Sequence, residues 1–295
     1  MTATPLTLRA DAETEAARLP ALLARAEHLA GAVLLGAHGR RRAGLGDDFW
    51  QYRPAQPGDS LRMIDHRRSA MGDTEFVRER EWQIAQSIML WVDQGASMRY
   101  ASEAALPQKI DRARLLGLAL AILLVRGGER VGLTGTTLPP RRGGSQILRL
   151  AELFSRDDAS EYAPPEHRAM IPHARAVFVS DFLGDIEEAK LALTKAADRG
   201  VRGVLCHLLD PSEEAFPFSG RTIFESIGGG ISHETLKASD LRDRYLDRLA
   251  ERKEELQSLC TLTGWHYGLH HTNTSAQSAL LWLYGAMDVK SGGPA

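Results

Sequence analysis

An uninterrupted apolar run, Ser87 to Val92, constrains the fold of this chain more than any other stretch. Such runs are typical of a buried central strand in a sheet that is covered on both faces. The run ends at Asp93, and Gly95 and Ser97 follow among other small residues. Ligands of open α/β sheets bind at the carboxyl ends of the strands, so Asp93 and Ser97 are candidate oxygen ligands for a cation. The simpler alternative is a strand end with a capping aspartate and a turn.

Composition narrows the class of protein. The 295 residues are 43% hydrophobic and 25% charged, which predicts a soluble globular protein with one large domain and an appendage, or two modest domains. The net charge of -2 argues against a dedicated nucleic-acid binder. Cys206 and Cys260 lack the spacing of a metal or redox motif, which favours buried, reduced thiols in a cytoplasmic protein. We expect no signal peptide and no membrane span.

Helices and strands alternate along most of the chain. Lys109 to Arg126 has the apolar spacing of a helix, and Arg130 to Leu133 reads as the strand after it. Further strands are expected over Ala174 to Ser180 and Val201 to Leu209, with a helix between them. Repeated β-α-β units predict a mainly parallel sheet flanked by helices.

The N-terminal part has a different character. An amphipathic helix is predicted over Asp11 to Gly36, and Arg40 to Arg42 lie between glycines in a loop that either grips an acidic partner or is simply solvated. Asp48 to Ala70 combines aromatic residues, prolines and alternating charges, and Glu75 to Trp82 then reads as a strand that pairs with the central strand. Aromatic and arginine side chains dominate binding surfaces, so this segment is a candidate recognition surface. Its candidate partner-binding residues are Arg53, Asp59, Arg62, Asp65 and Arg67. The alternative is a structural loop whose Asp–Arg pairs pin an extended segment.

These motifs resemble a known family. The tract from Tyr52-Arg53-Pro54 through Pro57-Gly58-Asp59 to Ile64-Asp65, followed by a charged strand and Asp93, resembles the bacterial "domain of unknown function 58" family. The resemblance extends from about Gly39 to the C-terminus. It implies a three-layer, von Willebrand factor A-like (Rossmann-type) α/β domain over residues 76–295. Residues 1–75 would form an N-terminal helix and a signature segment that pack on this domain.

The resemblance also implies a metal-ion-dependent adhesion site for Mg²⁺ or Mn²⁺. The matching positions are Asp93, Ser97, Ser145 and Asp181, although Ser145 is equally explained as a helix N-cap. Gly95 stands where the family's first serine supplies a hydroxyl, and His66 stands where a tryptophan is usual. A water would replace the missing ligand at reduced affinity, or the site is vestigial.

Neither a nucleophile–base pair nor a cofactor fingerprint is recognisable in the sequence. We therefore expect a non-enzymatic protein-interaction module. The resemblance implies that it works as an adaptor with a MoxR-type AAA+ ATPase in the assembly or activation of other proteins. Two alternatives are a metal-dependent phosphoester hydrolase that uses the same site, and a metal-free scaffold that binds through the arginine-rich segment Arg40 to Arg68.

Overall fold

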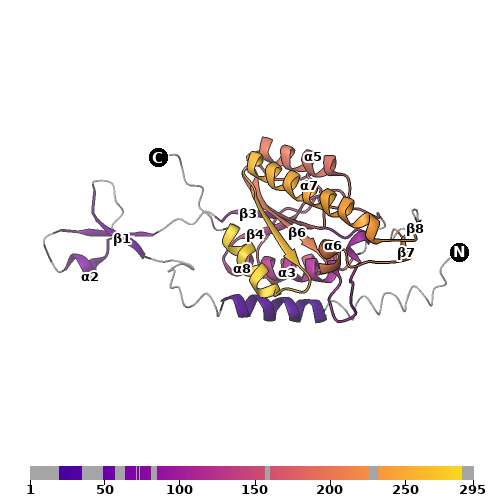
Figure 1. The fold of residues 1–295 in the computed structure, drawn as a ribbon. Helices are drawn as coiled ribbons and strands as arrows, with labels where there is room; N and C mark the ends of the chain where they lie inside the picture. The colour runs from indigo at the N-terminus through magenta and orange to yellow at the C-terminus, as the bar shows by residue number, and fades with distance from the viewer. Residues whose placement is uncertain are drawn as a thin grey trace. The chain divides into compact units, whose positions relative to one another are not determined.

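The computed structural model describes residues 20–34, 49–56, 64–70, 72, 74–80, 85–156, 160–225 and 232–287. The chain divides into two compact units, the larger formed by residues 1–36 and 86–295 and the smaller by residues 37–85 (Figure 1). The predicted N-terminal segment, residues 1–75, therefore draws on both units. Its packing as a whole on the main domain stays a prediction.

The larger unit is built on a five-stranded sheet. The strand order is β4-β3-β5-β6-β9, and every neighbouring pair runs parallel. The strands are β3 (Ser87–Val92), β4 (Arg130–Leu133), β5 (Arg175–Ser180), β6 (Arg202–Leu209) and β9 (His266–His271). The apolar run that ends at Asp93 forms β3, a buried interior strand with β4 on one side and β5 on the other, while the middle strand of the five is β5.

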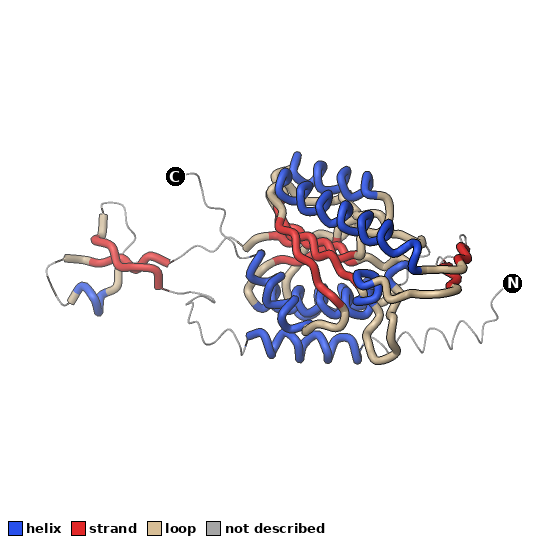
Figure 2. The backbone as a smooth tube through the Cα atoms, viewed as in Figure 1, coloured by secondary structure: helices blue, strands red, loops and turns tan. Residues whose placement is uncertain are grey.

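Helices cover both faces of this sheet (Figure 2). One face carries α3 (Lys109–Arg126), α4 (Gly144–Phe154) and α8 (Ala276–Met287), and the other carries α5 (Ile186–Asp198) and α7 (Ser239–Thr263). Alternate residues of β3 serve the two faces, since Leu90 packs into the α3 core and Trp91 into the α5 core. The predicted fold class, a three-layer α/β domain with a Rossmann-type parallel sheet, is confirmed.

A helix over residues 20–34 joins the α3 face of the core. Ala26, Ala30 and Val33 recur at helical spacing and are buried against it. The helix predicted over Asp11 to Gly36 is thus present in its C-terminal part, and residues 11–19 and 35–36 lie outside the described residues. Cys206 and Cys260 are buried free thiols, as predicted.

The smaller unit contains an antiparallel pair, β1 (Phe49–Pro54) and β2 (Phe76–Arg80), and the short helix α2 (His66–Ser69). The prediction that Glu75 to Trp82 pairs with the central strand is wrong. Both edges of β3 are already occupied by β4 and β5, so β2 pairs with β1 instead.

Shorter elements follow β3 and β6. They are the 3-10 turn η2 (Ala96–Met98), α6 (Pro211–Ala215), and the antiparallel strands β7 (Thr222–Glu225) and β8 (Ser232–Thr235). The hairpin expected from Thr222 onward corresponds to β7 and β8, while its three-glycine turn lies outside the described residues. None of the helices in the described ranges is both long and apolar enough to cross a membrane.

Candidate functional site

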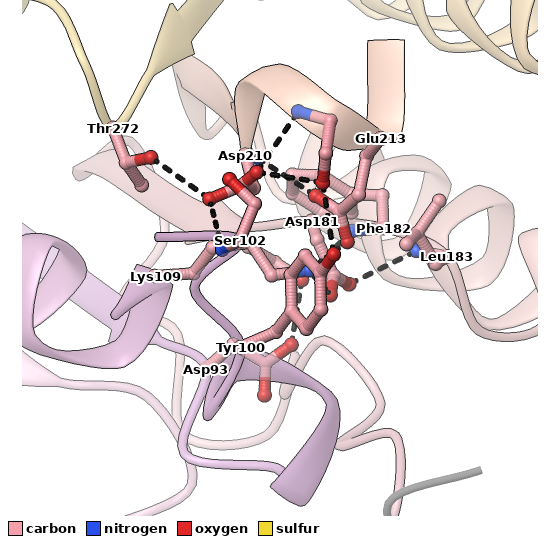
Figure 3. A network of polar contacts seen from close by, with 12 residues as sticks. Asp93, Tyr100, Ser102, Lys109, Asp181, Phe182, Leu183, Asp210, Glu213 and Thr272 are labelled. Atoms are coloured by element: carbon pink, nitrogen blue, oxygen red, sulfur yellow. Dashed lines mark hydrogen bonds and ion pairs between the residues drawn. The ribbon is translucent and has the colours of Figure 1, made fainter. Parts of the chain in front are cut away.

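Asp93 and Asp181 end neighbouring strands at the carboxyl edge of the sheet. β3 and β5 pair in register at Val92 and Val179, and the Asp93 N–H donates to the Val179 carbonyl oxygen at 3.0 Å. Both carboxyl groups are buried, with exposed fractions of 2% and 1%. The structure therefore brings together the two aspartates that the sequence indicated (Figure 3).

Hydrogen bonds from the protein itself hold the Asp93 carboxyl group. Its Oδ1 accepts from the Gly95 N–H at 2.7 Å, and its Oδ2 accepts from Ser180 Oγ at 2.6 Å. Burial raises the pKa of Asp93 to about 7, and the neighbouring charge of Asp181 adds to this effect. Asp93 is therefore partly protonated near neutral pH, and a protonated carboxyl group is a weak metal ligand.

A buried lysine that the sequence did not single out dominates the site. Lys109, the first residue of α3, places its Nζ 2.7 Å from Asp181 Oδ2 and 2.5 Å from Glu213 Oε1. Only 1% of its side chain is exposed. Burial opposes the charge, but the two carboxylates outweigh that cost and raise the pKa of Lys109 above its ordinary value. Figure 3 shows the resulting network, in which Lys109 is a fixed positive charge beside Asp181.

A capping box at α6 holds the second carboxylate in place. Asp210 Oδ1 accepts from the Ser212 N–H at 2.9 Å, and Glu213 Oε2 accepts from the Asp210 N–H at 2.8 Å. Asp210 Oδ2 also accepts from the Ser102 N–H at 3.0 Å, which ties the loop after η2 to α6. The Asp210-x-x-Glu213 spacing is a recognisable helix-start signal in the sequence. Its link to Lys109 has no comparable sequence signal.

The loop after Asp93 leaves no room for the serine that the family pattern has at Gly95. A Cβ there would lie 2.9 Å from Ala163 N, and 3.0 Å from both Asp93 Oδ1 and Glu161 O. The first distance is shorter than real Cβ contacts and the other two are tighter than most, and two of these three atoms are backbone atoms. Packing around the loop therefore favours glycine at position 95.

Ser97 Oγ is buried and has no hydrogen-bond partner within the described part of the chain.

Ser145 is not brought to this site. It is exposed in the first turn of α4, and the N-cap of that helix is Gly143, so the N-cap interpretation was wrong. The adjacent Gln146 donates to the Val131 carbonyl oxygen at 2.8 Å, and Val131 pairs with Ile88 near the start of β3. Ser145 thus lies toward the amino end of the strands, away from Asp93.

The residues present do not fit Mg²⁺ or Mn²⁺. Lys109 already neutralises Asp181 and would repel a divalent cation there. Of the expected ligands, only Asp93, with its raised pKa, and the Ser97 hydroxyl remain, whereas Mg²⁺ needs near-octahedral oxygen coordination. No group of three or more His, Cys, Asp or Glu side chains is arranged to hold a metal within the described ranges.

The candidate partner-binding residues lie in the smaller unit. The backbone of Arg53 pairs with Val77 in the β1–β2 ladder, while Asp59 and Arg62 lie outside the described residues. Asp65 is the N-cap of α2, and its Oδ1 accepts from the Arg68 N–H at 3.0 Å. Arg67 is exposed on α2. Asp65 therefore has a structural role, while Arg67 is accessible to a partner.

Comparisons with known proteins agree on one family. The family model described as "Protein of unknown function DUF58" matches residues 51–255. An uncharacterized protein of Mycobacterium bovis is 27% identical over 239 residues, which cover 76% of this chain and 74% of that protein. Uncharacterized proteins from two strains of Mycobacterium tuberculosis match with the same identity and coverage. No solved structure matches significantly.

Proposed function

Because this chain belongs to the DUF58 family, we propose that it is a non-enzymatic protein-interaction module that works without a divalent metal. Its partner in this proposal is a MoxR-type AAA+ ATPase, for which it serves as an adaptor in the assembly or activation of other proteins. The partner and the cytoplasmic location rest on the family resemblance and the sequence.

One observation carries the metal-free part of the proposal. The Lys109 ammonium group is buried between Asp181 and Glu213, at the edge of the sheet where the family pattern has a metal ion. A lysine fixed there supplies the positive charge and leaves Asp181 charge-compensated. A phosphoester hydrolase using this site would need the metal for its chemistry, so the same observation weakens that alternative.

Calorimetric titration tests the metal-free proposal directly. Mg²⁺ and Mn²⁺ are titrated into the full chain and into Asp93→Ala, and we expect no saturable heat from either protein. Saturable binding to the wild type that is lost in Asp93→Ala would show a working metal site and overturn this part of the proposal.

A binding assay tests the partner. The full chain is immobilised and a purified, nucleotide-free MoxR-type ATPase from the same organism is passed over it, first in EDTA and then in Mg²⁺. We expect the same affinity in both buffers. Binding that appears only with Mg²⁺ contradicts the metal-free mechanism, and no binding in either buffer contradicts the partner. Arg67→Glu in the same assay asks whether the arginine-rich segment is the contact surface, since Arg67 is exposed.

A further inference from the structure

A pocket of about 270 Å³ lies beside Asp93 and Asp181 at the carboxyl edge of the sheet. Apolar groups form much of its wall, among them Pro164, Pro165 and Phe182. Pockets for small-molecule ligands usually measure about 300–1,000 Å³. This pocket is therefore better matched to a single amino-acid side chain than to a cofactor or a drug-sized molecule.

The polar part of the pocket is strongly acidic. Four carboxyl groups line it, from Asp93, Asp181, Asp185 and Glu188. Lys109 compensates Asp181 and shares its charge with Glu213. In the part of the chain that the structure describes, neither Asp185 nor Glu188 forms an ion pair, and both are exposed. The pocket thus has more negative charge than Lys109 can neutralise.

The nearby Arg252 is not paired with these carboxylates in the described part of the chain. Arg252 of α7 donates to the carbonyl oxygens of Phe182 and Gly184, at 2.7 and 2.8 Å, from outside the pocket lining. These carbonyl oxygens are neutral, so Arg252 keeps its charge, but among the described residues it forms no ion pair with Asp185 or Glu188. A ligand that supplies a positive charge would complement them.

We propose that this pocket binds an arginine side chain of a partner protein, which names the partner chemistry of the interaction function proposed above and rests on that function. The prolines pack against the side-chain stem and the flat guanidinium face, while Asp185 and Glu188 accept its N–H groups. A metal-ion-dependent adhesion site would instead capture a carboxylate. The same edge of the sheet therefore recognises the opposite charge in this protein.

The test is an NMR titration of the isotope-labelled full chain with N-acetyl-arginine methylamide, whose only charge is the guanidinium group. We expect saturable shifts of the Gly184 and Tyr162 amide signals, because both residues line the pocket. The matched acidic probe, N-acetyl-glutamate methylamide, should give none. Stronger binding of the glutamate probe than of the arginine probe, or no shift with the arginine probe, would overturn the proposal.

Matched variants locate the binding site. Glu188→Gln and Asp185→Ser should each lower the affinity for the arginine probe about 2- to 5-fold, as expected for the loss of an exposed ion pair. Serine is chosen at position 185 because Asp185 is the N-cap of α5, and serine keeps that cap. Glu187→Gln is the control, since it removes the same charge from the neighbouring position, where Glu187 pairs with Lys190. Equal weakening by all three variants would indicate general electrostatic attraction and would refute a pocket site.

Two further outcomes separate this inference from the function on which it rests. If the ATPase binds the full chain while the arginine probe does not, the pocket inference fails and the proposed function stands. If the probe binds and the ATPase does not, the pocket is correct and the named partner is wrong. Binding of free arginine without binding of the blocked probe would indicate a small-molecule site and overturn the assignment to a protein side chain.

Discussion

Replacing Lys109 by methionine should lower the free energy of unfolding by about 3–5 kcal/mol, the usual cost of removing one partner from a buried ion pair. Lys109 Nζ lies 2.7 Å from Asp181 Oδ2, and both side chains are 1% exposed. At this distance and an effective dielectric constant of about 20, the Coulomb attraction is about 6 kcal/mol before desolvation is subtracted. Methionine keeps most of the side-chain volume, so the loss measures the missing charge and not a cavity.

Urea unfolding followed by circular dichroism measures this loss. Lys190→Met is the control, because Lys190 pairs with Glu187 on the exposed face of α5 and should cost less than about 1 kcal/mol. The double variant Lys109→Met/Asp181→Asn should recover part of the stability, since asparagine leaves no uncompensated charge at position 181. A loss in Lys109→Met no larger than in Lys190→Met would refute the idea that this lysine compensates buried carboxylates.

Three further predictions concern the groups around this site. The raised pKa of about 7 of Asp93 stabilises the wild type below about pH 4, and up to about 4 kcal/mol of its free energy of unfolding is lost as the pH rises to about 7. Asp93→Asn should remove this pH dependence, measured by urea unfolding across that range. Burial lowers the pKa of His207 to about 4, so the free energy of unfolding of the wild type should fall by up to about 3 kcal/mol as the pH falls from about 6.5 to 4. This loss should be absent in His207→Phe. Gly95→Ser should lower the free energy of unfolding by about 1–3 kcal/mol through overpacking, and added Mg²⁺ should not restore the midpoint of unfolding. Recovery with Mg²⁺ would mean that the missing hydroxyl alone had disabled a metal site.

Much of the fold could be predicted from local patterns. The apolar run of β3 and the helical spacing of α3 are properties of neighbouring residues, and both elements lie where the sequence placed them. The pairing of β2 could not be predicted in this way, because the residues of a charged strand do not indicate which other strand it pairs with. Ser145 failed as an N-cap for a related reason: the helix begins earlier than predicted, and Gly143 occupies the capping position.

Only part of the candidate site could be predicted from the sequence. Asp93 and Asp181 could be predicted because parallel strands end at a common edge. Lys109 could not, since a lysine at a helix start reads as an exposed residue, and its burial depends on α6, whose Glu213 lies 104 positions further along the chain. Lysine is unfavourable at the positive end of the helix dipole, but this rule does not identify Asp181 or Glu213 as the partner of Lys109.

The sequence separation within the Lys109 cluster bears on how the protein unfolds. Lys109 is 72 positions from Asp181 and 104 from Glu213, so the cluster closes two long loops. Closing loops of this length is entropically costly, and the alignment of three chain segments requires β3, β5 and β6 to be paired already. We therefore expect the cluster to form late in folding, after the sheet, and to contribute mainly to the barrier against unfolding. On this expectation, Lys109 at the edge of the sheet sets how slowly the native state unfolds.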